Sequence, residues 1–146
     1  MAQQHQLSWL IPIDGSEISL KPIDWVIAHL DDWKTAPTLH LLNVQPALPR
    51  DISRFINNEQ IQDFHREEGL KALAAADRQL QAAGLTPQLH ISVGESAETI
   101  VEFAANKTCD QILIGTRGHT GLGGTLLGSV ASKIAHLTHV PLLLVR

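Results

Sequence analysis

Short apolar runs that alternate with helical patterns limit the fold of this chain more than any other feature. The five runs cover residues 7–13, 39–44, 88–93, 111–115 and 142–145. The last two are almost wholly apolar, which is typical of strands buried on both faces of a parallel sheet. The run at 88–93 alternates apolar and polar residues, so we expect it nearer an edge of the sheet.

Apolar residues at helical spacing fill the intervals between these runs. The four stripes are Ile23, Val26, Ile27 and Leu30; Leu70, Leu73, Ala76 and Leu80; Ala97, Ile100, Val101 and Ala104; and Val130, Ile134 and Leu137. The second helix is expected over about 58–83, with a stop at Gly84, and Ser96 is the expected N-cap of the third. Strands that alternate with helices predict right-handed crossovers and a parallel sheet covered on both faces.

Length and charge narrow the class of protein. The chain has 146 residues, the usual size of one domain, so we expect a single domain over residues 1–146. A formal net charge of -4 gives no indication of general binding to nucleic acid or to an anionic membrane. Cys109 is the single cysteine, and neither a signal-peptide pattern nor a membrane-spanning apolar run is present, so we expect a cytoplasmic protein.

A glycine-rich segment follows the fourth apolar run. Six of the ten glycines fall within the fifteen positions 115–129. Glycines let backbone N–H groups approach a ligand closely, and successive N–H groups form concavities that bind anions. A helix that begins near Ser129 adds free N–H donors and the positive end of its dipole. The segment predicts phosphate binding, with a mobile glycine-rich surface loop as the alternative, and it matches neither the Walker A nor the G-x-G-x-x-G motif.

The spacing of these glycines resembles a known pattern. Gly115-x2-Gly118-x9-Gly128-Ser129 fits the G-x2-G-x9-G-[S/T] pattern of ATP-binding universal stress proteins. The opening at residues 11–16 and the tail at 128–146 are also similar to that family, and the likeness is weakest at 45–57, where we expect an exposed loop. The resemblance implies a doubly wound, Rossmann-like five-stranded parallel sheet of order 3-2-1-4-5, akin to adenine-nucleotide α-hydrolases. Ligands of such sheets bind at the carboxyl ends of strands where the winding reverses.

The same resemblance implies a set of residues that would hold a nucleotide. They are Pro12, Ile13, Asp14, Val44, Gly115, Arg117, Gly118, Gly128, Ser129 and Val130. Asp14 would lie beside the nucleoside and Val44 against adenine, while the glycine segment and the helix start would hold ribose and phosphates. Asp14 has a second reading, because Asp-Gly-Ser is a common turn in which the carboxylate bonds the backbone two residues on. The implied ligand is ATP, with Mg²⁺ on its phosphates.

Two functions of different classes follow from this reading. The first is an ATP-binding sensor or adaptor in the stress response, not an enzyme, because no side chain stands out as a general base and hydrolysis would be slow at most. The second is an interaction module with a vestigial nucleotide site, working as a homodimer through the apolar edge strand Leu142–Val145. A nucleotidyl transferase on a related fold is supported by the fold alone.

Other conspicuous side chains are expected to be structural. His40 and His90 lie on expected neighbouring strands, where a shared site is conceivable but satisfied or surface histidines are favoured. Cys109 precedes a buried strand and is expected to be an inert thiol. The three tryptophans, Trp9, Trp25 and Trp33, are expected to pack against other residues rather than to bind a ligand.

Overall fold

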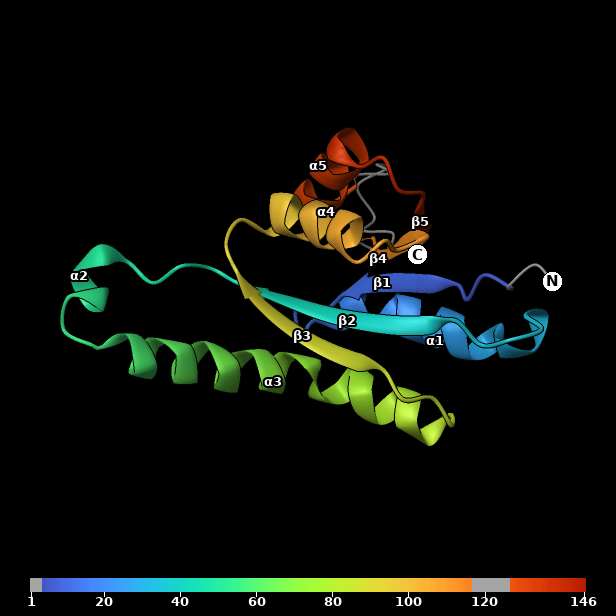
Figure 1. The fold of residues 1–146 in the computed structure, drawn as a ribbon, viewed down its shortest axis with the longest axis horizontal. Helices are drawn as coiled ribbons and strands as arrows, with labels where there is room; N and C mark the ends of the chain where they lie inside the picture. Colours follow the sequence, from blue (N-terminus) through green and yellow to red (C-terminus); the bar gives the residue numbers. More distant parts are fainter. Residues whose placement is uncertain (1–3, 117–126) are drawn as a thin grey trace, which may run out of the picture.

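Five parallel strands form one sheet in the computed structural model, which describes residues 4–116 and 127–146 (Figure 1). The strands are β1 (Ser8–Pro12), β2 (Thr38–Gln45), β3 (Gln88–Val93), β4 (Gln111–Gly115) and β5 (Leu142–Val145). Their spatial order is β3-β2-β1-β4-β5, which confirms the expected doubly wound topology. The alternating strand β3 lies at one edge, as its pattern predicted, and β1 lies at the centre. The prediction that the run at 142–145 is buried on both faces is wrong, because β5 is the other edge strand and Val145 is its one buried residue.

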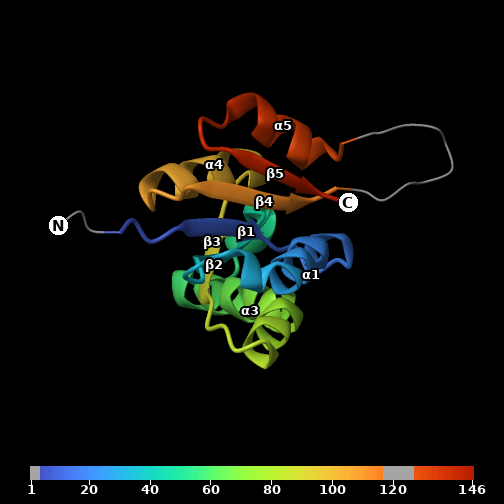
Figure 2. The same cartoon turned by 90° about the vertical axis from the view of Figure 1, so that its right-hand side faces the viewer.

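Helices cover both faces of this sheet (Figure 2). They are α1 (Lys21–Ala28), α2 (Arg50–Ser53), α3 (Asn58–Ala82), α4 (Ser96–Asn106) and α5 (Ser129–Leu137), with short 3-10 turns η1 (Ile18–Leu20) and η2 (Leu30–Asp32). Two hydrophobic clusters form, one on each face of the sheet, and alternate residues of β1 contribute to different ones. Trp9 and Ile11 pack with residues of α1 and α3, and Leu10 packs with residues of α4 and α5. Each such fully buried Leu or Ile side chain contributes about 1.5–3 kcal/mol.

Helix α3 has clear start and stop signals. The Asn57 side chain accepts a hydrogen bond from the Gln60 backbone N–H at 2.8 Å, and the Gln60 side chain accepts one from the Asn57 N–H at 3.1 Å. This capping box explains why the helix begins at Asn58. Gly84 has a φ of 84°, a conformation that favours glycine, and the expected stop is confirmed.

Two local expectations are wrong. Ser96 is not the N-cap of α4 but its first residue, and Glu95 holds the N-cap position without a side-chain hydrogen bond. Glu95 has the extended conformation of an N-cap residue, with φ of -75° and ψ of 129°, so the helix begins at Ser96 itself. The segment 45–57 is not wholly loop, because α2 begins directly after Pro49, a position where proline does not oppose a helix.

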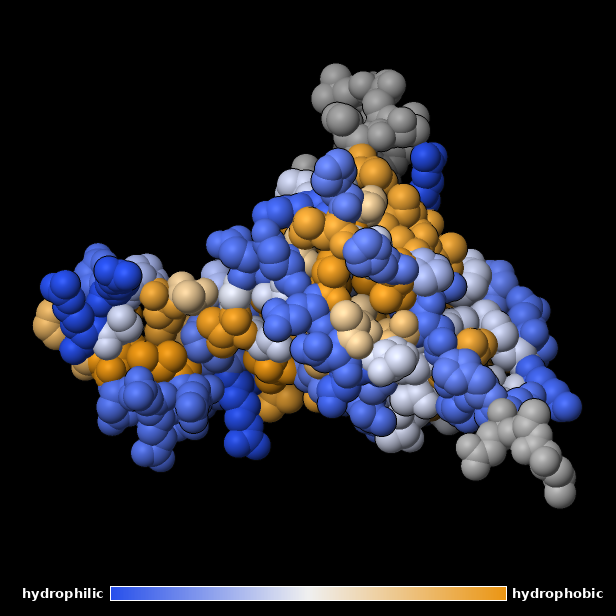
Figure 3. Space-filling view, turned by 45° about the horizontal axis from the view of Figure 1, so that its top comes forward, coloured by the Kyte–Doolittle hydropathy of each residue, from blue (hydrophilic) through white to orange (hydrophobic). Residues whose placement is uncertain are grey.

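Helix α2 and the first part of α3 extend beyond the sheet (Figure 1). The surface between them is apolar (Figure 3). Large apolar side chains are exposed here, and Phe55 is 89% exposed, with Ile52 and Phe64 about half exposed. No helix in the described part of the chain is long and apolar enough to cross a membrane.

The tryptophans pack together, as expected. Trp9 lies edge-to-face against Trp33 with ring centroids 4.7 Å apart, and Trp25 lies 6.4 Å from Trp9 and 5.8 Å from Trp33. These distances are those of favourable aromatic pairs. The cluster joins β1 to α1 and to the segment before β2.

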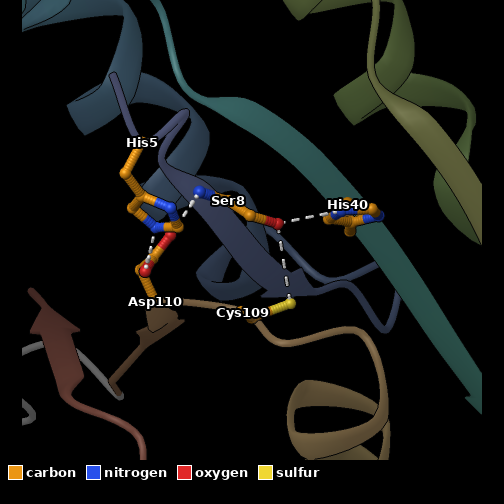
Figure 4. Close-up of polar contacts among 5 residues, drawn as sticks. All are labelled: His5, Ser8, His40, Cys109 and Asp110. Atoms are coloured by element: carbon orange, nitrogen blue, oxygen red, sulfur yellow. Dashed lines mark hydrogen bonds and ion pairs between the residues drawn. The ribbon is translucent and has the colours of Figure 1, made fainter. Parts of the chain in front are cut away.

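A chain of polar contacts lies where β1 and β4 begin (Figure 4). His40 Nδ1 lies 3.0 Å from His90 Nε2, His40 Nε2 lies 3.1 Å from Ser8 Oγ, and Ser8 Oγ donates to Cys109 Sγ at 3.9 Å. Burial lowers the pKa of both histidines and raises the pKa of the Cys109 thiol. The histidines are thus satisfied and the thiol is protonated at neutral pH, as the structural reading predicted.

Candidate functional site

A cavity of about 330 Å³ opens at the carboxyl ends of β1, β2 and β4. Strands β1 and β4 are neighbours in the sheet, and the winding reverses between them. Doubly wound sheets bind their ligands at this point because the connections leave to opposite faces and open a crevice. Further lining comes from η1 and from the first turns of α4 and α5.

Eight of the ten residues proposed from the sequence line this cavity. They are Pro12, Ile13, Asp14, Val44, Gly115, Gly128, Ser129 and Val130. The other two, Arg117 and Gly118, lie outside the described residues. These eight residues come from the ends of three strands and from the start of one helix. Pro12 and Val130 are 118 positions apart in the sequence (130 − 12), yet both line this one cavity.

Asp14 ends β1 as the turn residue that its sequence suggested. Its Oδ1 accepts a hydrogen bond from the Ser16 backbone N–H at 2.8 Å. Burial acts to raise the pKa of Asp14, but hydrogen bonds from Ser16 and Ser19 outweigh it, and the pKa lies below its ordinary value. Asp14 is therefore a carboxylate at neutral pH, able to accept hydrogen bonds from hydroxyl or amino groups of a ligand.

The wall formed by Ile13 is fixed by a buried amide. Asn43 is 3% exposed, and its Nδ2 donates to the Ile13 carbonyl at 2.8 Å. Gln45 Nε2 donates in turn to Asn43 Oδ1 at 2.7 Å. The backbone N–H of Ile13 donates to the Leu42 carbonyl at 2.9 Å, so the end of β1 is tied to β2 beyond the strand itself. The sequence reading missed Asn43, whose only signal was a polar residue inside an apolar run.

The first turn of α5 lies in the wall of the cavity. Ser132 N–H bonds to the Gly128 carbonyl at 2.9 Å, and Gly128, at the N-cap position, has no side chain that could cap the first turn. Ser129, Val130 and Ala131 line the cavity in that turn, which carries no acidic residue. Within the described residues of this turn no carboxylate compensates the positive end of the helix dipole, which favours an anion at this end of the cavity.

Two lining glycines lack side chains for different reasons. A Cβ placed on Gly115 would lie 2.0 Å from the Ile18 carbonyl oxygen, so the packing of β4 against η1 requires glycine. A Cβ placed on Gly128 would meet no atom within 4 Å among the described residues, and its φ of -57° is open to any residue. Packing against described residues explains Gly115 but not Gly128, where the missing side chain leaves the backbone open to the cavity.

The sequence reading also missed several lining residues. These are Ser16, Ile18, Ser19, Leu42, Ser96, Ile100, Ile114 and Ala131, the last noted only as a missing hydroxyl. Ser96 could have been found, because it follows the carboxyl end of a strand, where this fold binds ligands. Lys133 does not reach the lining and instead pairs with Glu98 at 2.5 Å, joining α5 to α4.

The cavity has a polarity suited to one class of ligand. Asp14 is the one ionisable side chain among its described lining residues, and the anion-attracting helix start is a separate part of the wall. Apolar side chains of Val44, Leu42 and Ile100 provide a surface for a flat ring. No group of three or more His, Cys, Asp or Glu side chains in the described residues could hold a metal ion.

A doubly wound sheet with a cavity at the carboxyl ends of its strands defines the class of α/β proteins that bind small ligands at the point where the winding reverses. The sequence model of the Universal stress protein family matches residues 9–146, and the chain belongs to this family. It is 34% identical over 140 residues to the universal stress protein MJ0531 of Methanocaldococcus jannaschii, covering 94% of this chain and 80% of that protein.

Solved structures share the fold. That of MJ0577 from the same organism superposes with a TM-score of 0.75 at 27% identity, covering 95% of this chain and 94% of the other. A universal stress protein from Archaeoglobus fulgidus in complex with dAMP gives a TM-score of 0.70 at 17% identity, covering 98% and 100%. At that identity the second likeness concerns the fold alone.

Proposed function

We propose that this protein binds ATP in the cavity at the ends of β1, β2 and β4, and acts as a nucleotide-dependent sensor or adaptor in the stress response. The observation that carries the proposal is the start of α5. A Cβ on Gly128 would meet no atom within 4 Å among the described residues, and the backbone N–H groups of the first turn of α5 follow it in the cavity wall. This combination suits a phosphate group.

The charges of the cavity set the orientation of the nucleotide. The carboxylate of Asp14 repels phosphates and accepts hydrogen bonds from ribose hydroxyls, so the nucleoside belongs at β1 and β2. The phosphates belong at Gly128 and Ser129, whose hydroxyl can donate to them. The dAMP complex of the Archaeoglobus fulgidus protein supports an adenine nucleotide as the class of ligand on this fold.

A divalent cation would rest on the phosphates rather than on the protein. Phosphate oxygens are the hard ligands that Mg²⁺ prefers, and the described residues offer no metal cluster of their own. Asp14 is the single ionisable group in the described lining, and it belongs at the nucleoside end, away from the terminal phosphate. We therefore propose a protein that holds ATP with slow hydrolysis at most, not an enzyme.

The same proposal includes a cytoplasmic homodimer paired through β5. In the described sheet β5 pairs with β4 on one side only, and Leu144 is 37% exposed. An apolar edge strand is a template for pairing with a second chain. A symmetric dimer would cover this edge and present two nucleotide sites to a partner.

A titration calorimetry experiment with ATP and Mg²⁺ tests the site. Ser129→Ala and Ser132→Ala make the same change on the same helix, but only Ser129 lines the cavity. We expect sub-millimolar binding by the wild type, weakened by Ser129→Ala and by Gly128→Ala and unchanged by Ser132→Ala. Absence of sub-millimolar binding by the wild type would refute the proposal. Native mass spectrometry of the purified protein tests co-purified nucleotide and dimer mass together.

A further inference from the structure

A second hollow, of about 500 Å³, lies between α3, the end of β3 and the segment that joins β2 to α2. It shares no described lining residue with the proposed nucleotide cavity. Its apolar wall is formed by Ala47, Leu48, Ile61, Ile91 and Val93. Cavities of about 300–1,000 Å³ with mainly apolar walls and a few polar groups are typical of small-molecule sites.

His65 is a polar group in this wall that the protein leaves unused. The residue is 5% exposed, on the face of α3 that packs against the sheet. Its buried Nδ1 has no hydrogen-bond partner in the described part of the chain. Buried polar atoms nearly always have partners, because an unpartnered one costs about 1–3 kcal/mol. A ligand that bonds the imidazole would remove this cost.

The charge of the wall favours an anionic group at that point. Arg66 follows His65 in the same wall, and within the described residues it forms no ion pair. The described lining contains no carboxylate. A guanidinium beside an imidazole gives an anion charge-assisted hydrogen bonds, and the rest of the wall accepts an apolar body.

We propose that this hollow is a second binding site, for a small amphipathic carboxylate with an apolar body. The carboxylate binds at His65 and Arg66, and the apolar body lies against Ile61, Ile91 and Val93. A concave wall with one polar end fits a single small molecule better than a flat protein surface. Because Arg66 has no carboxylate beside it in the described lining, the head group of the ligand should be negatively charged.

Decanoate is a suitable probe, titrated below its micelle concentration and followed by calorimetry and saturation-transfer NMR. Decylamine has the same body with the opposite charge, and acetate has the same head without the body. We expect saturable binding of decanoate and much weaker binding of both controls. Saturating ATP with Mg²⁺ is expected to leave decanoate bound, because the two cavities share no lining. Displacement by ATP would place decanoate in the other cavity and overturn the proposal.

Variants locate the binding. Arg66→Gln is expected to lower the affinity for decanoate by about tenfold or more, which is the loss expected when a hydrogen bond to a charged group is removed. Arg78→Gln is the matched control, since Arg78 is exposed on the same helix outside the hollow. Ala47→Trp, at an exposed loop position, is expected to fill the hollow and abolish binding, while Gly128→Ala leaves it unchanged. Equal effects of the two arginine variants, no saturable binding, or equal affinity for decylamine would each overturn the proposal.

Discussion

Gly115→Ala tests whether the site is held in place by the close approach of β4 to η1. The added Cβ would lie 2.0 Å from the Ile18 carbonyl oxygen and 2.9 Å from its carbonyl carbon. Real Cβ contacts are essentially never shorter than 3.0 Å, so the two backbones must separate by 1.0 Å (3.0 − 2.0). Neither can move freely, because β4 is paired on both sides and the Ser19 side chain ties η1 to the Ser16 carbonyl.

Overpacking of this kind costs about 1–3 kcal/mol, occasionally more. For a chain of this length each kcal/mol lowers the melting temperature by about 2–4 °C. Urea unfolding measures the free energy, with Gly128→Ala as control, since its Cβ meets no described atom and exchange at an N-cap costs about 1 kcal/mol or less. If Gly115→Ala is as stable as the wild type, the close packing of β4 against η1 is refuted.

Three further predictions concern the packing around the two cavities. Gly69→Ala places a Cβ 2.6 Å from Ile91 Cδ1, 2.7 Å from Cγ1 and 2.8 Å from Cγ2, and should cost about 1–3 kcal/mol in urea unfolding. Because Ile91→Ala removes all three atoms, the double variant should lose less stability than the sum of the two single variants, and additive losses would contradict the contact. Asn43→Ala removes the hydrogen bond to the Ile13 carbonyl, so it should lower the free energy of unfolding by about 1–3 kcal/mol and also weaken ATP binding. A loss of stability with unchanged ATP binding would show that Asn43 does not position the site. Burial lowers the pKa of His40 and His90 from 6.5, so the unfolded chain binds more protons than the folded chain below that pH, and the free energy of unfolding should decrease as the pH is lowered. His40→Asn should make this decrease less steep. An unchanged slope in unfolding measured against pH would contradict the prediction.

Much of the fold could be predicted because the central strands carry their own signal. The apolar run at Gln111–Gly115 coincides with β4, since a strand buried on both faces needs apolar residues at nearly every position. The equally apolar run at Leu142–Val145 coincides with β5, but β5 is a partly exposed edge strand, so the pattern predicted the strand and not its place in the sheet. Helix α2 has one turn, too short for a periodic pattern, and it was missed. Ser96 looked like a cap, but Glu95 has the extended N-cap conformation and Ser96 is the first helical residue of α4.

The candidate site was predictable only where it lies in local motifs. Gly128 and Ser129 belong to a spaced pattern, and Asp14 to a turn sequence, and all three line the cavity. Ile100 reaches the cavity, and Asn43 bonds the Ile13 carbonyl behind its wall, through the packing of elements far apart in the sequence, which no local pattern encodes. The second hollow was not foreseen at all, because His65 reads as one polar residue on a long helix until the sheet behind it is placed.

The tryptophan cluster has a spectroscopic consequence. Three indoles with ring centroids 4.7–6.4 Å apart couple their electronic transitions, so a strong near-ultraviolet circular dichroism signal is expected from β1 and α1. None of the three lines either of the two cavities. The signal should therefore persist when a variant loses a ligand and vanish when it loses its native packing, which gives every substitution above an internal check on folding within one spectrum.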